Sequence, residues 1–158
     1  MPTDHARVEY QVFTKLAPEA YGALTTLGKT VGAAGLDQEL TELVKLRVSQ
    51  INGCAFCVQY HLNVARRLGV VAVKLDLVAA WRDAGVFSAR EAAALAWAEH
   101  LTRLAADAAP EHARDAVREH FSETETVFLT IAIGTINAWN RLGVGLGFAP
   151  LPPREAAA

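Results

Sequence analysis

The sequence has few of the features that mark secreted, membrane-spanning or nucleic-acid-binding proteins. It contains only two cysteines, Cys54 and Cys57, so a disulfide scaffold is excluded. It has no apolar run of the roughly 18 residues that a membrane span needs, and no basic segment followed by an apolar one at its start. The formal net charge of −2 lacks the basic excess typical of nucleic-acid binders. We therefore expect a cytoplasmic protein that binds neither membranes nor nucleic acid.

Strand signals are also scarce, whereas apolar residues are abundant. No stretch shows sustained alternation of apolar and polar residues, and the one Asn-Gly pair lies between two helical patterns. Hydrophobic residues make up 52% of the 158 residues and charged residues 20%, which is enough to build a sizeable core. The length corresponds to one domain. We expect a single all-α domain over residues 1–158.

Caps and stops along the chain set the expected helix boundaries. Pro18 suits a first helical position, Asp37 is a helix N-cap, and Asn52-Gly53 is a helix stop. Two capping boxes open at Ser88 and Ser122, each followed three residues later by a glutamate. The expected helices cover about residues 18–31, 38–51, 54–68, 71–85, 88–106, 110–121 and 122–142.

The last of these helices, 122–142, is apolar almost all round. Such a helix is buried at the centre of a domain or lies between subunits. Together with the high apolar content, it leads us to expect a homo-oligomer. From residue 143 to 158 the chain carries three glycines, three prolines and a final alanine triplet, which predicts an irregular tail.

The two cysteines carry the strongest chemical signal. Cys54 directly follows a helix stop, so it lies in the first turn of the next helix, where the helix dipole favours a thiolate. Cys57 is three residues further on and His61 four more, which places all three on one helix face. Cys57 is thus close enough to Cys54 for a disulfide, and an imidazole at this spacing can take a proton from the Cys57 thiol or stabilise its thiolate.

Glu42 completes the constellation from the preceding helix. If the helices 38–51 and 54–68 pack antiparallel across the short turn, Glu42 approaches His61. A carboxylate on the far imidazole nitrogen would fix the ring tautomer and raise its basicity. The sequence therefore predicts a thiol, a second thiol, a base and an orienting carboxylate on two adjacent helices.

Two other interpretations of the cysteine pair remain open on these residues alone. Free cysteines are often buried and inert, so the pair can simply be two small core residues. Cys54, Cys57 and His61 could also supply three zinc ligands, although structural zinc usually needs four. Haem attachment is excluded, because Val58 follows Cys57 where a histidine is required. His100, His112 and His120 lie among charged residues and are expected at the surface.

The stretch from Glu42 to His61 resembles the core motif of the AhpD-like alkylhydroperoxidases in the carboxymuconolactone decarboxylase superfamily. The residues that carry the resemblance are Leu-Arg-Val-Ser-Gln-Ile-Asn-Gly-Cys followed by Cys-x-x-x-His, and later Ile-Asn-Ala-Trp-Asn-Arg at 136–141. Trp81-Arg82, Phe87-Ser88 and the segment 99–102 fall between them in the expected order. The resemblance covers about residues 18–145.

The resemblance implies an all-α fold in which a helical hairpin carries the redox pair, assembled as trimers or hexamers. It implies that Cys57 attacks a peroxide and that Cys54 resolves the resulting sulfenic acid as a disulfide. His61 and Glu42 would form the proton relay. The implied partners are a peroxide substrate and an external thiol or dithiol reductant, with no cofactor and no metal.

The sequence departs from the resemblance at one position. Well-known peroxidase members have a histidine between the two cysteines, where this chain has Phe56, so one proton-delivering group is missing. The namesake decarboxylases of the superfamily act on a lactone acid and do not rely on a cysteine pair. A lactone enzyme and a thiol–disulfide oxidoreductase that is not a peroxidase are the alternative functions.

Overall fold

The described part of the chain is helical and contains no strand. The structure is a computed structural model that describes residues 7–104 and 110–155. Within these two ranges nine α-helices follow one another: α1 Tyr10–Leu16, α2 Pro18–Ala33, α3 Gln38–Asn52, α4 Ala55–Leu68, α5 Ala72–Leu77, α6 Trp81–Ala84, α7 Ala89–Thr102, α8 Pro110–Arg118 and α9 Glu123–Leu146. This confirms the all-α class, and none of the described helices is long and apolar enough to cross a membrane.

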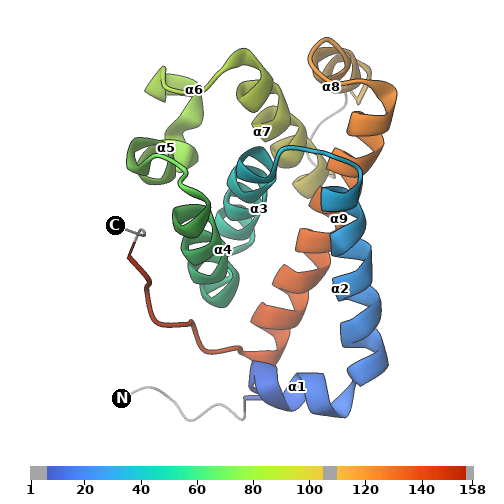
Figure 1. The fold of residues 1–158 in the computed structure, drawn as a ribbon, viewed down its shortest axis with the longest axis vertical. Helices are drawn as coiled ribbons and strands as arrows, with labels where there is room; N and C mark the ends of the chain where they lie inside the picture. The colour runs from blue at the N-terminus through green and yellow to red at the C-terminus, as the bar shows by residue number, and fades with distance from the viewer. Residues whose placement is uncertain (1–6, 105–109, 156–158) are drawn as a thin grey trace.

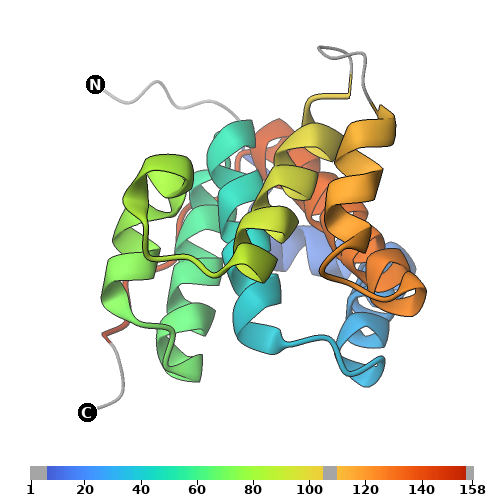
Figure 2. The same ribbon diagram turned by 90° about the horizontal axis from the view of Figure 1, so that it is seen from above.

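Helix α3 occupies the centre of the fold and packs against α4, α7 and α9 (Figures 1 and 2). Its apolar residues Leu40, Val44 and Val48 join α7 and α9 in the main core. Helix α9 also packs along α2 and contributes fully buried Leu129 and Ile133. The last helix is therefore central, one of the two positions that its apolar sequence indicates.

Most of the expected helix boundaries are confirmed through their caps. The Asp37 carboxylate accepts the backbone N–H groups of residues 39 and 40, and both Ser88 and Ser122 form complete capping boxes. Gly53 and Gly69 end their helices in the left-handed region, with φ of 66° and 89°. Each boundary follows from local chemistry, because a cap satisfies backbone groups that the helix leaves unpaired.

Four boundaries differ from the sequence-based expectation. The segment 71–85 is not one helix but α5, a 3₁₀ turn at Val78–Ala80 and α6. Helix α7 ends at Thr102 rather than near Ala106, a residue outside the described range, and α8 ends at Arg118 rather than at 121. Helix α9 continues to Leu146, so the irregular tail starts later than residue 143. The break after α5 turns Trp81 and Arg82 toward the Glu99 carboxylate, which accepts a hydrogen bond from each.

The ends of the described chain pack against each other and against α4. Helix α1, which the sequence pattern did not predict, buries Phe13, and the Val8 amide donates to the Leu146 carbonyl. After α9 the chain has no helix up to residue 155 and runs back toward α4 (Figure 1). There the Asn63 side chain donates to the carbonyl of Pro152 at 3.0 Å and accepts the Arg154 amide at 2.9 Å. The described part of the tail is irregular, as expected, but it is held in place.

Candidate active site

The α3–α4 hairpin brings the predicted site residues together. Gly53, in the left-handed conformation, turns the chain between the two helices, which form the most extensive helix pair of the fold. A residue with a Cβ would be strained at this φ. The antiparallel pairing places Glu42 of α3 beside His61 of α4, at 2.6 Å between carboxylate and ring. The proximity that the sequence predicts is therefore present.

Cys54 and Cys57 lie at the N-terminus of α4 and are joined by a disulfide, with their Cα atoms 5.2 Å apart. Cys54 is the N-cap residue, and its Sγ accepts the Cys57 backbone N–H at 3.2 Å. Both side chains are buried, with 1% of Cys54 and 4% of Cys57 exposed. The backbone donors at this helix end would stabilise negative charge on either sulfur after reduction.

Helix α9 approaches the disulfide closely at Gly143. A Cβ at this position would lie 2.7 Å from Sγ of Cys54 and 3.3 Å from Sγ of Cys57. Phe148, just beyond α9, and Phe13 of α1 pack in the same buried cluster as both cysteines. The absence of a side chain at residue 143 is thus what makes room for the sulfur pair, and Cys54 is enclosed on this side.

Glu42 and His61 form a buried, charge-assisted pair. Burial by itself raises the pKa of Glu42, but the hydrogen bond and charge of His61, together with Lys45, outweigh it and lower the pKa from 4.5 to about 2. The second carboxylate oxygen accepts from Lys45 Nζ at 2.8 Å. Because an ionised carboxylate can only accept, the Nδ1–H of His61 donates to it, so Nε2 is the ring nitrogen that can accept a proton when the ring is neutral.

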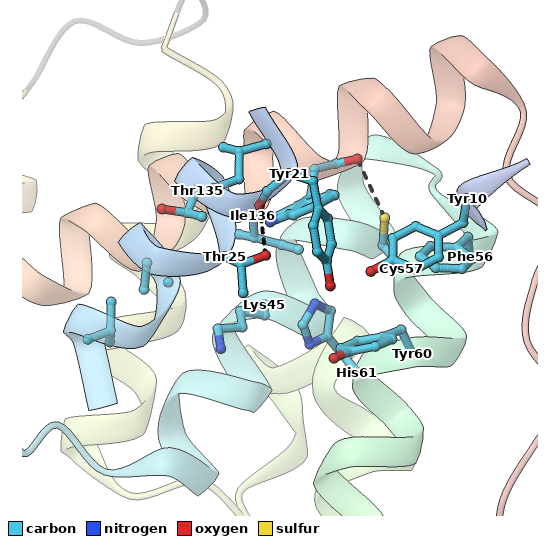
Figure 3. A pocket seen from close by; sticks show the side chains of 15 residues that line it. Tyr10, Tyr21, Thr25, Lys45, Phe56, Cys57, Tyr60, His61, Thr135 and Ile136 are labelled. Carbon is cyan, nitrogen blue, oxygen red and sulfur yellow. Dashed lines mark hydrogen bonds between the residues drawn. The ribbon is translucent and has the colours of Figure 1, made fainter. Parts of the chain in front are cut away.

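A cavity of about 210 Å³ opens beside the sulfur of Cys57 (Figure 3). Cys57 and His61 line it, whereas Cys54 does not. Most of its wall is aromatic or aliphatic and comes from α1, α2, α4 and α9, with the residues Tyr10, Tyr21, Leu24, Val31, Phe56, Tyr60, Ala132, Ile136 and Trp139. The cavity therefore gives a small molecule access to one sulfur of the pair, inside a largely apolar enclosure.

Three phenols surround this cavity, and at least two of them hold their protons firmly. Burial raises the pKa of Tyr10, and a hydrogen bond with Tyr21 raises it further. Burial and the negative charge of Glu42 also raise the pKa of Tyr60. At neutral pH the hydroxyls of Tyr10 and Tyr60 are therefore protonated. The Tyr10 hydroxyl is engaged with Tyr21, whereas the Tyr60 hydroxyl can donate a hydrogen bond into the site.

A chain of amides and a hydroxyl fastens the hairpin to α9. Asn140 is buried, donates to Ser49 Oγ at 3.0 Å and accepts from Asn52 Nδ2 at 2.9 Å. Asn52 also donates to Asn137 at 2.9 Å. These contacts join α9 to the end of α3, directly before the turn that leads to Cys54. They fix the position of the sulfur pair relative to Gly143.

A second buried carboxylate, Glu99, lies outside the cavity lining. It accepts hydrogen bonds from Arg47 at 2.8 Å, from the Trp81 indole at 3.0 Å and from Arg82. Burial raises its pKa, and these donors lower it below the usual value. Glu99 thus ties α3, α6 and α7 together. We interpret its role as structural, because its hydrogen-bond donors are side chains of neighbouring helices.

Among residues 7–104 and 110–155, no three His, Cys, Asp or Glu side chains are grouped so that they could hold a metal ion. Sequence reasoning did not identify Tyr10, Tyr21 or Trp139 as site residues, nor Gly143. They reach the site from helices far away in sequence, so no local spacing signals them. Lys45 did carry a signal, because it lies one helical turn after Glu42.

Comparison with known proteins places the chain in a family. The family pattern of the carboxymuconolactone decarboxylase family matches residues 18–100. The chain is similar to the uncharacterised protein YdfG of Bacillus subtilis, with 35% identity over 141 residues, covering 89% of this chain and 94% of YdfG.

Solved structures are also similar. ATU0492 of Agrobacterium tumefaciens, a protein of unknown function suggested to be the antioxidant defence protein AhpD, has 39% identity and a TM-score of 0.84 over 89% of this chain and 96% of that one. The debrominase Bmp8, at 20% identity, shares the fold with a TM-score of 0.79 over 89% of this chain and 75% of its own. The sequence, the helical hairpin with its cysteine pair and these relatives agree that the chain is an AhpD-like member of the carboxymuconolactone decarboxylase family.

Proposed function

We propose that the protein is a thiol-dependent peroxidase that reduces organic peroxides with Cys57 as the nucleophile. The observation that carries the proposal is that Cys57 lines a cavity together with His61, whose ring is held by Glu42 at 2.6 Å. Cys54 lies within disulfide distance behind it. A nucleophile, a base and an orienting group in this order are the elements of covalent catalysis.

The reaction starts from the reduced pair. His61 Nε2 takes the proton of the Cys57 thiol, and the Glu42 carboxylate stabilises the imidazolium that results. The thiolate attacks the terminal peroxide oxygen, the O–O bond breaks, and Cys57 becomes a sulfenic acid while an alcohol leaves. Cys54 then attacks the Cys57 sulfur, water is released and the disulfide forms. An external dithiol returns both residues to thiols and is itself oxidised to a disulfide.

The fold alone does not select this reaction, and the support for it comes from the cysteine pair together with the carboxylate–imidazole pair beside it. Bmp8 has the same fold and is a debrominase, so helices of this arrangement support more than one chemistry. A lactone decarboxylation would leave the sulfur pair without a task. The buried carboxylate–imidazole pair and the accessible Cys57 sulfur are instead the groups that a thiolate attack on oxygen needs.

The decisive experiment measures peroxide consumption by the reduced protein with dithiothreitol as the dithiol. We expect turnover by the wild type and its loss in Cys57→Ser. Cys54→Ser should still react once, and without added thiol its Cys57 should gain about 16 Da as a sulfenic acid. Wild-type turnover in Cys57→Ser would overturn the proposal.

A parallel assay separates the peroxidase from a general thiol–disulfide oxidoreductase. The wild type is given dithiothreitol and a disulfide-containing protein such as insulin, without peroxide. We expect the rate of insulin reduction to stay near that of dithiothreitol alone. Efficient insulin reduction combined with no peroxide consumption would support the oxidoreductase instead.

A further inference from the structure

The proposed peroxidase leaves one proton unassigned. When the O–O bond breaks, the departing oxygen of an alkyl peroxide leaves as an alkoxide, which is a poor leaving group unless it receives a proton. The two residues between the cysteines, Ala55 and Phe56, have hydrocarbon side chains that cannot donate one. Phe56 is buried and packs on Tyr10, with ring centroids 5.1 Å apart. The proton must come from elsewhere in the cavity.

We propose that Tyr21, held by Tyr10, is the proton donor to the departing peroxide oxygen. This inference rests on the proposed peroxidase function and adds a catalytic residue to it. Tyr21 comes from α2, a helix that contributes neither cysteine nor the Glu42–His61 pair.

The position of Tyr21 in the cavity supports this assignment. Its side chain reaches from α2 into the cavity, and its hydroxyl points toward the edge of the His61 ring (Figure 3). Tyr10, Tyr21, Cys57 and His61 all line this cavity, and in the same view the two hydroxyls are drawn between the sulfur of Cys57 and that ring. A peroxide whose terminal oxygen meets the sulfur would have its second oxygen in this space.

The aromatic neighbours of Tyr21 hold its ring in this orientation. Its ring packs edge-on against Tyr10 and Trp139, with centroid distances of 6.1 and 6.2 Å. Edge-to-face contacts of this kind favour one ring orientation. The phenol is therefore preorganised, and little reorganisation is needed when the oxygen departs.

The proton balance closes without an additional reactant. His61 Nε2 receives the proton of the Cys57 thiol, and the Tyr21 hydroxyl gives its own proton to the alkoxide as the O–O bond breaks. The imidazolium of His61 then returns a proton to the Tyr21 oxygen. The net result is that the thiol proton ends on the alcohol, the sulfur is oxidised to a sulfenic acid, and both Tyr21 and His61 regain their starting state.

The test compares Tyr21→Phe with the wild type on peroxides that differ in their leaving group. tert-Butyl hydroperoxide releases a strongly basic alkoxide, whereas peracetic acid releases acetate, which needs no proton. We expect Tyr21→Phe to lower the rate constant for Cys57 oxidation by about 100-fold with tert-butyl hydroperoxide. With peracetic acid the decrease should be less than about threefold, because general acid catalysis contributes little to a good leaving group.

Alkylation of reduced Cys57 in the Cys54→Ser background by iodoacetamide is the matched control. Iodide leaves without a proton, so Tyr21→Phe should be alkylated at the wild-type rate if the fold and the thiolate are intact. Equal losses with tert-butyl hydroperoxide and peracetic acid would overturn the role of Tyr21 while leaving the peroxidase in place. A wild type that oxidises with neither peroxide would overturn the peroxidase and, with it, this inference.

Discussion

Gly143 shows how a single missing methyl group makes room for the site. In a helix interior, Gly→Ala normally stabilises a protein by about 0.5–1 kcal/mol. At this position the new Cβ would lie 2.7 Å from Sγ of Cys54, 3.3 Å from Sγ of Cys57 and 3.6 Å from the Phe148 ring, and the disulfide leaves the two sulfurs little room to relax. We expect Gly143→Ala to lower the free energy of unfolding of the oxidised protein by about 1–3 kcal/mol, measured by urea titration.

Gly134→Ala, on the same helix, is the control for this prediction. A Cβ added at Gly134 would have no atom of another part of the fold within 4 Å. Gly134→Ala should therefore raise stability by about 0.5–1 kcal/mol, as its helical setting predicts. If both variants shift stability in the same direction, steric contact with the disulfide is not what requires glycine at 143.

The ionised state of Glu42 links the site to stability in acid. Its pKa is about 2 in the folded protein, below the ordinary value of 4.5, so folding favours the charged form. The ionised Glu42 carboxylate therefore contributes fully to the free energy of unfolding above about pH 4.5, and this contribution is lost as the pH falls toward 2. We expect the free energy of unfolding to decrease less steeply across this range in Glu42→Gln than in the wild type.

Urea titrations at several pH values between about 2 and 5 test this expectation, with Glu119→Gln as the control for an exposed carboxylate. The control should follow the wild-type pH dependence. If Glu42→Gln showed the same pH dependence of the free energy of unfolding as the wild type, His61 and Lys45 would not be what stabilises the charge of the Glu42 carboxylate.

Local spacing was enough to predict part of the site. Cys57 and His61 are four residues apart on one helix, and the turn at Gly53 made the approach of Glu42 calculable from residue counts. Tyr21 and Gly143 could not be found in this way. Their contacts with the site depend on how α2 and α9 cross the hairpin, which is decided by packing among the side chains of several helices.

Among the elements, α9 holds the hairpin in position through Asn140. This side chain is 1% exposed and bonded to both Ser49 and Asn52. Truncation to alanine would leave buried polar partners unsatisfied and a cavity beside them. We expect Asn140→Ala to lower the free energy of unfolding by about 2–4 kcal/mol.

Asn137→Ala is the matched variant, because Asn137 shares the contact with Asn52 but is only half-buried. Water can replace the hydrogen bonds that Asn137→Ala loses. We therefore expect this variant to lower the free energy of unfolding, measured by urea titration, by about 1 kcal/mol. A larger loss in Asn137→Ala than in Asn140→Ala would contradict the view that the buried amide fastens α9 to α3.

The elements that could be predicted are those with strong local signals. The capping boxes at Ser88 and Ser122 gave correct helix starts because cap and helix lie within four residues of each other. Helix α1 has no side-chain hydrogen bond at its N-cap and is seven residues long, so it depends on Tyr10 and Phe13 packing against distant aromatic rings. The break after α5 brings Trp81 to the distant Glu99, and no local pattern reveals this contact.

At the scale of the molecule, exposed apolar side chains on three helices support the expectation of a homo-oligomer. Leu16 of α1 is 75% exposed, Leu27 of α2 is 43% exposed and Val127 of α9 is 51% exposed. Burial of such groups between copies would stabilise an assembly by about 25 cal/mol per Å². We expect light scattering to give three or six times the chain mass of 17.0 kDa. A particle with the mass of one chain at micromolar concentration would contradict this.

The enclosure of Cys54 makes thiol exchange at the disulfide directional. Gly143 and Phe148 close off Cys54, so an incoming reductant meets the sulfur of Cys57 first. Cys54 then departs as a thiolate that the Cys57 backbone N–H already caps, at 3.2 Å. In Cys54→Ser, peroxide converts Cys57 to a sulfenic acid, which condenses with one thiol of the electron donor, releases water and joins the donor to Cys57 by a disulfide. A donor that lacks its second thiol then stays attached. The Cys54→Ser variant can therefore capture the protein's own reductant, because no internal thiol competes for the oxidised Cys57.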